Sequence, residues 1–176
     1  GLALCLLFGC QVSAEEKSSR VDALPYYEEA SFTPNWLGTD EQEIADFHQI
    51  PAFSLVNQEG DTITEADFEG KIYVTDFFFT FCPGICSRMT ANMMLLQEAF
   101  EEDDEVMLLS HSVTPRRDSV PVLKAYAADR DISATKWHLV TGDQDQIYRL
   151  GREAYFVEED QGLEKDEDDF LHTENF

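Results

Sequence analysis

Apolar residues follow two kinds of spacing along the chain from residue 47 onward. In residues 51–70, two short runs of alternating apolar and polar residues lie on either side of the sequence Gln-Glu-Gly-Asp at 58–61, and this predicts a β-hairpin. Three longer apolar runs predict buried strands: KIYVTDFFFTF (71–81), EVMLLSHSV (105–113) and KWHLVTG (136–142). The first run is rich in β-branched and aromatic residues, so we expect a central strand that is buried on both faces.

A helical spacing follows each of these three strands. In residues 82–100, Met89, Met93, Leu96 and Phe100 recur at the spacing of one helical face. Residues 121–132 and 143–156 predict two further helices. Because strands and helices alternate, we expect an α/β fold in which helices cover both faces of a parallel sheet.

The first 46 residues differ from the rest of the chain. Residues 1–10, GLALCLLFGC, are apolar but fewer than the roughly 20 that a membrane-spanning helix needs, and they fit the apolar part of a secretory signal. Their end resembles a bacterial lipobox, so we expect Cys10 to carry lipid, with a plain signal peptide or membrane anchor as the alternative. Residues 11–46 are polar and acidic and predict a tether. The domain at 47–176 is therefore expected to be exported, at the outer face of a bacterial membrane or in the periplasm.

The composition limits the possible partners. The length of 176 residues suits one domain with flanking segments, at about 150 residues per domain. The 12 basic and 36 acidic residues give a net charge of −24, which argues against nucleic acid and anionic lipid surfaces as partners. This charge is concentrated in residues 15–46, 101–105 and 158–169. It indicates a solvated surface or, as an alternative hypothesis for 158–169, attraction of a basic partner.

One close pair of cysteines needs a chemical explanation. Cys5 lies in the signal and Cys10 is assigned to lipid, which leaves Cys82 and Cys86. The sequence Cys-Pro-Gly-Ile-Cys lies where a predicted strand passes into a helix. Pro83 suits a first helical turn, and the free N–H groups of that turn stabilise a thiolate. The spacing is predicted to place both sulfurs on one helical face, where they can form a disulfide or bind one soft ion such as Cu(I) or Zn(II).

Other residues near the pair have two possible roles. Asp76 is an acid within an apolar strand, and a buried carboxylate must be paired or protonated. It either tunes the nearby thiols or accepts structural hydrogen bonds. Met89, Met93 and Met94 could suggest copper ligands, but their spacing favours the core face of a helix.

Four segments carry a resemblance to a known family: FSLVNQEG, KIYVTDFFFTFCPGICSRMT, SVTPRRDSVPVLKAYA and WHLVTGD. They resemble the Sco/SenC family of copper-binding, thioredoxin-like proteins, in which three residues separate the two cysteines where ordinary thioredoxins have two. The resemblance implies an α/β, thioredoxin-like fold with a central mixed sheet, flanking helices and an N-terminal hairpin. It also implies further strands and a helix after residue 176 in the complete domain.

The family's function implies roles for particular residues. Its members are metallochaperones that deliver copper to the binuclear copper site of cytochrome c oxidase, and two cysteines and one distant histidine bind the metal. Cys82 and Cys86 match the cysteines, and His172 matches the histidine of a D-x-x-H-[ST] element. Such a site can hold Cu(I) or Cu(II). The other three histidines, His48, His111 and His138, are expected to be structural. Arg116, Arg117 and Asp118 match the family's loop after its second strand and are expected to serve structure or docking.

Two other functions use the same thiols. The chain is either a copper chaperone or a thiol–disulfide oxidoreductase that reduces the receiving oxidase subunit, with Cys82 or Cys86 as the nucleophile. A redox or copper sensor is a third hypothesis, and its affinity for a partner would change with the state of the cysteine pair. The copper chaperone alone requires His172. A peroxidase is disfavoured because no Thr or Arg partner set is evident around Cys82.

Overall fold

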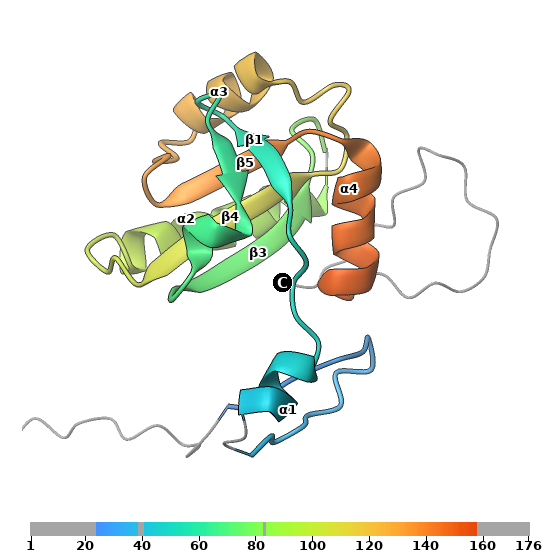
Figure 1. Cartoon of the computed structure of the whole chain (residues 1–176). Coiled ribbons are helices and arrows are strands. Elements are labelled where there is room, and N and C mark those ends of the chain that lie inside the picture. Colours follow the sequence, from blue (N-terminus) through green and yellow to red (C-terminus); the bar gives the residue numbers. More distant parts are fainter. Residues whose placement is uncertain (1–23, 39–40, 83, 158–176) are drawn as a thin grey trace, which may run out of the picture.

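A mixed sheet forms the centre of the molecule (Figure 1). The computed structural model describes residues 24–38, 41–82 and 84–157. The strands are β1 (Ser54–Asn57), β2 (Thr62–Thr64), β3 (Ile72–Phe78), β4 (Val106–Ser112) and β5 (Trp137–Thr141), in the order β2-β1-β5-β4-β3. Strands β3, β4 and β5 are parallel, whereas β1 is antiparallel to both of its neighbours. The strands following the hairpin are thus parallel as predicted, and the hairpin makes the sheet mixed.

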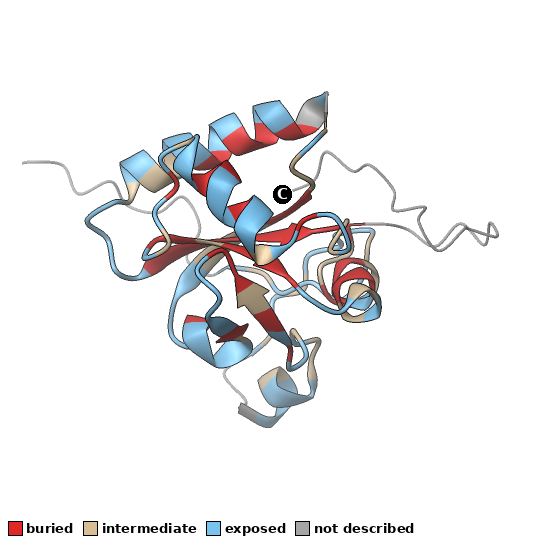
Figure 2. Ribbon diagram, turned by 90° about the horizontal axis from the view of Figure 1, so that it is seen from above, coloured by how far each residue is buried: buried red, intermediate tan, exposed pale blue. Residues whose placement is uncertain are grey.

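Helices cover both faces of the sheet, and buried residues concentrate between them and the strands (Figure 2). One face packs against α2 (Ile85–Ala99) and α3 (Val120–Ala128). The other packs against α4 (Gln144–Arg149), which continues as a π-helical turn, η2 (Leu150–Ala154). Leu108 and Leu109 of β4 are both fully buried on opposite faces, because successive strand side chains alternate. Each contributes roughly 1.5–3 kcal/mol to stability.

The position of β3 differs from the prediction. We expected a central strand buried on both faces, but β3 lies at one edge of the described sheet and β4 takes the central place. Ile72 is 68% exposed, and only Asp76, Phe77 and Phe78 are buried within the strand. The prediction was wrong because it rested on composition. Side chains of β3 pack against helices on both faces of the sheet, as those of a central strand would, although β3 has a neighbouring strand on one edge only.

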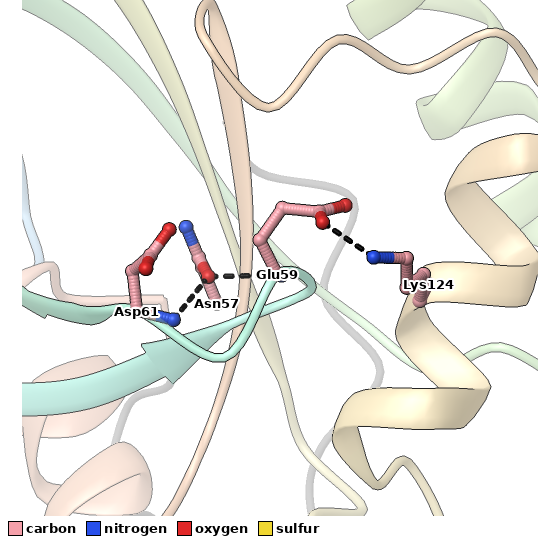
Figure 3. Close-up of polar contacts among 4 residues, drawn as sticks. All are labelled: Asn57, Glu59, Asp61 and Lys124. Atoms are coloured by element: carbon pink, nitrogen blue, oxygen red, sulfur yellow. Dashed lines mark hydrogen bonds and ion pairs between the residues drawn. The ribbon is translucent and has the colours of Figure 1, made fainter.

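The predicted hairpin is confirmed, and its turn is held by side chains (Figure 3). The Asn57 Oδ1 atom accepts hydrogen bonds from the N–H groups of Glu59 and Asp61, each at 2.9 Å. Gly60 has a φ of 89°, a conformation that favours glycine. Lys124 of α3 forms an ion pair with Glu59 and so connects the turn to the helix layer.

Part of the predicted tether has regular structure. It contains α1 (Glu41–Asp46) and an antiparallel bridge between Tyr26 and Asn35. The ring of Phe32 contacts that of Phe156, with centroids 6.5 Å apart. Residues 1–23, and with them Cys10, lie outside the described residues, so the lipid anchor and the domain boundaries remain predictions. The described helices include none that is both long and apolar enough to cross a bilayer.

Candidate thiol and metal site

The two cysteines lie on different local structures. β3 ends at Phe78, and α2 begins at Ile85 with Gly84 as its N-cap. Cys82 therefore precedes the helix, and only Cys86 lies in its first turn. The prediction that both sulfurs share one helical face was wrong, because the helix begins three residues after Cys82. Pro83, which we expected in the first helical turn, lies outside the described residues.

The thiols nevertheless contact each other. Cys82 is half-buried, Cys86 is buried, and both are free cysteines whose side chains form a hydrogen bond. Partial burial acts to raise the pKa of Cys82, but hydrogen bonds from the Cys86 thiol and from the backbone of Gly84 and Cys86 bring this pKa below its usual value. Burial, and next the neighbouring Cys82, raise the pKa of Cys86. Cys82 is therefore the sulfur that ionises first.

Asp76 lies behind the pair, within the core. Its side chain is 1% exposed and bonds to Ser110, whose hydroxyl also accepts from the indole N–H of Trp137 at 2.8 Å. Its Oδ1 atom has no partner among the described residues. Burial raises the pKa of Asp76 to about 6, and the Ser110 hydrogen bond opposes this rise. The ionised carboxylate in turn contributes to the raised pKa of Cys86. Asp76 thus has a structural hydrogen bond with Ser110, and its charge also raises the pKa of the Cys86 thiol.

The raised pKa of Asp76 predicts a pH-dependent stability. Between its unfolded pKa near 4 and its folded pKa of about 6, the folded chain binds more protons, so Asp76 lowers the free energy of unfolding as pH rises through this window. Asp76→Asn is expected to raise the free energy of unfolding by about 1–3 kcal/mol at pH ~8 and to change it little at pH ~4. Urea unfolding at both pH values measures the effect.

An exposed carboxylate serves as the control for this prediction. Asp104 is exposed in the loop between α2 and β4. Asp104→Asn should change the free energy of unfolding equally at the two pH values. A lower stability of Asp76→Asn at the higher pH would show that the carboxylate is paired and that its ionised form is favoured by the fold.

Three histidines have structural contacts, as predicted. The Nε2 atom of His48 lies 2.9 Å from the carbonyl oxygen of Ala154, and His138 contacts the side chain of Asn57 at 3.4 Å. His111 is fully buried and its Nδ1 atom lies 3.2 Å from the Thr75 hydroxyl, although its Nε2 atom has no partner within the described part of the chain. Burial lowers the pKa of His111 to about 4, so the ring is neutral at pH 7.

The structure does not test the full predicted ligand set. It brings Cys82 and Cys86 together, whereas His172 lies outside the described residues. Within the described ranges no group of three His, Cys, Asp or Glu side chains is arranged to hold a metal. Met89 and Met93 are buried in the core as predicted, and Met94 is 36% exposed.

Asp118, which the sequence matched only to a family loop, connects the segment that carries Cys82 to its surroundings. We call residues 79–82, which follow β3, the thiol loop. Asp118 is fully buried, and its carboxylate accepts hydrogen bonds from the hydroxyls of Thr80 and Ser112, each at 2.6 Å, and of Thr114 at 3.1 Å. The N–H of Thr80 donates to it as well, at 3.2 Å. Because Thr80 lies two residues before Cys82, Asp118 holds the thiol loop against the loop between β4 and α3. The hydroxyl residues Ser112 and Thr114, shortly before Asp118, are the sequence signal that could have indicated this.

Some proteins that are similar to this chain in sequence and fold have been described with bound copper or as cytochrome c oxidase assembly proteins. The chain is 31% identical over 133 residues to the SCO1 protein homolog of Bacillus subtilis, covering 73% of this chain and 67% of that protein. The match covers less than half of the length of each of two further curated relatives. A structure of BsSco, reported for a disulfide switch and described as a member of the Sco family of cytochrome c oxidase assembly proteins, is 30% identical, with a TM-score of 0.58 over 71% of this chain and 72% of that one.

A second solved structure is that of ScoI from Bradyrhizobium japonicum with copper bound. It is 25% identical, with a TM-score of 0.54 over 60% of this chain and 66% of that chain. These likenesses confirm the predicted thioredoxin-like α/β fold. The family model described as SCO1/SenC matches residues 41–176, which is most of the chain. The chain therefore belongs to the SCO1/SenC family.

Proposed function

We propose that this protein is a metallochaperone that carries copper to the binuclear copper site of cytochrome c oxidase. The observation that carries the proposal is the contact between the Cys82 and Cys86 thiols at the start of α2. Two thiolates form a soft donor pair that favours Cu(I) over hard cations. The copper-bound ScoI structure and the description of BsSco as an oxidase assembly protein support the same function.

The two thiols are suited to different parts of copper handling. Cys82 ionises readily and is half-buried, so it is the sulfur that an incoming copper donor or acceptor reaches first. Cys86 is buried and holds its proton more tightly, so copper must displace that proton to complete the pair. His172 supplies an imidazole as the third ligand, from a segment distant in sequence from the thiols. A site shared between separate segments can release its cargo by losing one ligand at a time.

A thiol–disulfide oxidoreductase is the second candidate, and the unequal thiol pKa values favour it specifically. The Cys82 thiolate would attack a partner disulfide, forming a mixed disulfide and releasing one partner thiolate. Cys86 would then attack the Cys82 sulfur, releasing the second partner thiolate and leaving a Cys82–Cys86 disulfide. The disulfide switch reported for BsSco is consistent with such chemistry. A sensor whose partner affinity follows the state of this pair uses the same reaction.

We further propose that the protein is exported and held at the outer face of a bacterial membrane by lipid on Cys10. The apolar run at 1–10 and the resemblance of its end to a lipobox support this location. Mass spectrometry of the protein purified from membranes tests it directly. A diacylglycerol-modified Cys10 at the mature N-terminus is expected, and an unmodified or uncleaved N-terminus would contradict the proposal.

His172→Ala separates the two candidate functions. For a chaperone, this variant is expected to lose about a hundredfold or more in Cu(I) affinity, since one of three ligands is removed. Its rate of thiol–disulfide exchange should stay unchanged, because that reaction uses the cysteines alone. His48→Gln, at a histidine that contacts the Ala154 carbonyl, should keep both properties. Unaltered copper affinity in His172→Ala would exclude the three-ligand site.

A further inference from the structure

We infer that Phe81, Arg116 and Arg117 form a docking surface for an acidic protein that exchanges copper or thiols with Cys82. We call these three residues the arginine surface. The inference names the chemistry of the partner and rests on the proposed function for what is exchanged.

The arginine surface adjoins the reactive sulfur. Phe81 directly precedes Cys82 and is 44% exposed. The guanidinium carbon of Arg117 lies 3.8 Å from the centre of the Phe81 ring, and the Phe79 ring packs against Phe81 with centroids 4.9 Å apart. An arginine stacked on an exposed aromatic ring presents apolar area and charge together, and both phenylalanine and arginine are enriched at protein interfaces.

The charge of this surface is opposite to that of the chain. Arg116 and Arg117 line a cleft of about 400 Å³ together with Val113, Thr114, Gln144 and Tyr148, and none of these described lining residues carries a carboxylate. This positive cleft contrasts with the composition of the whole chain, in which 36 acidic residues outnumber 12 basic ones. Asp118 follows in sequence, but it is fully buried and its oxygens accept the bonds from Thr80, Ser112 and Thr114. Within the described part of the chain neither guanidinium group forms an ion pair, so both can bind carboxylates of another molecule.

The position of the surface favours a separate protein as its occupant. An adjoining cleft of about 730 Å³ contains Arg116, Arg149 and Arg152, but Asp143, Asp145 and Glu153 balance them, so it offers no comparable excess of positive charge. Because Phe81 directly precedes Cys82, a partner that binds the arginine surface lies beside the residue with which it exchanges copper or thiols. Asp118 directly follows Arg117 and its carboxylate binds Thr80 of the thiol loop, so the arginine surface and Cys82 keep a constant relation as such a partner approaches.

Thiol exchange with charged peptides tests the inference without copper. Two peptides each carry one cysteine, flanked by four glutamates in one and four glutamines in the other. The peptide thiolate attacks the Cys82–Cys86 disulfide of the oxidised full chain, forms a mixed disulfide and releases the other cysteine as a thiolate. Each rate constant is divided by that of the same peptide with a small uncharged disulfide, which corrects for differences in thiol pKa.

The sign of the result is informative because the chain is strongly acidic. Without a local positive surface, the net charge of −24 repels the glutamate peptide, which should then react more slowly than the glutamine peptide. With the arginine surface, the glutamate peptide is expected to react about fivefold faster at low salt. This advantage should disappear at ~0.5 M salt and in the double variant Arg116→Gln/Arg117→Gln. A slower glutamate peptide with the native chain would overturn the inference.

A matched variant separates local docking from net charge. Lys71→Gln/Lys124→Gln changes the net charge equally at sites outside the cleft and should keep the preference for the glutamate peptide. Equal losses in both double variants would overturn the inference. So would sedimentation showing a dimer that Arg116→Gln/Arg117→Gln dissociates, since the occupant would then be a second copy. Copper titration of Arg116→Gln/Arg117→Gln should give the same affinity as the native chain. If the native chain failed to bind copper, that result would contradict the proposed function and leave the docking inference standing.

Discussion

Cys82→Ser and Cys86→Ser are each expected to lower the affinity for Cu(I) by roughly a thousandfold or more. Thiolate–metal sites of four ligands yield apparent binding free energies of about 10–16 kcal/mol, so one thiolate of a three-ligand site accounts for several kcal/mol. A serine hydroxyl cannot replace it, because it is a hard donor that stays protonated at neutral pH. The loss should be similar at the two positions, although Cys82 is half-buried and Cys86 buried.

Competition with a chromophoric Cu(I) chelator under anaerobic conditions measures this loss. Serine is close to cysteine in size, so the fold is expected to survive, and far-UV circular dichroism verifies it. Ser87→Ala, at an exposed neighbour of Cys86 on α2, should leave the affinity unchanged. If either cysteine variant kept its affinity within about tenfold, that sulfur would not be a copper ligand.

Asp118→Ala is expected to lower the free energy of unfolding by about 3–4 kcal/mol. The substitution leaves the hydroxyls of Thr80, Ser112 and Thr114 without the carboxylate that accepts them. Hydrogen bonds to a charged group contribute about 1.5–3 kcal/mol each, and unpaired buried donors add a desolvation cost. Reorientation of the hydroxyls recovers part of this energy, so the sum is smaller than three full bonds.

Urea unfolding measures this loss, with Asp104→Ala at an exposed loop position as the matched control. Asp118→Asn should fall between the two, since it keeps one acceptor oxygen. We also expect Asp118→Ala to loosen the thiol loop through Thr80, and hydrogen exchange of the amides at 79–82 reports this. A loss below ~1 kcal/mol would mean that the hydroxyls find other acceptors and that Asp118 does not hold the loop.

Local patterns were sufficient for most of the elements. The hairpin follows from alternation around a turn sequence, and α2 follows from the spacing of Met89 and Met93. The edge position of β3 could not be predicted in the same way, because the neighbours of a strand depend on pairing between distant segments. The start of α2 was also misplaced. The prediction put Pro83 in the first helical turn because proline is tolerated there, but the helix begins at Ile85.

The site was predictable where its chemistry lies in one segment. Cys82 and Cys86 are recognisable from their close spacing in a chain whose other two cysteines lie in the predicted signal segment, and Asp76 from its place in an apolar strand. The bonding of Asp118 joins hydroxyls from the thiol loop, β4 and the following loop, so it depends on the folded arrangement. The contact between Arg117 and Phe81 likewise joins two loops far apart in sequence.

X-ray absorption of copper bound to the reduced chain tests the central claim most directly. The 176-residue chain is titrated with Cu(I) without oxygen, and the ligands are identified from the copper edge and its fine structure. We predict one copper per chain with two sulfur ligands and one imidazole nitrogen, and loss of that nitrogen signal in His172→Ala. Absence of bound copper under reducing conditions, or a nitrogen ligand that persists in His172→Ala, would contradict the account.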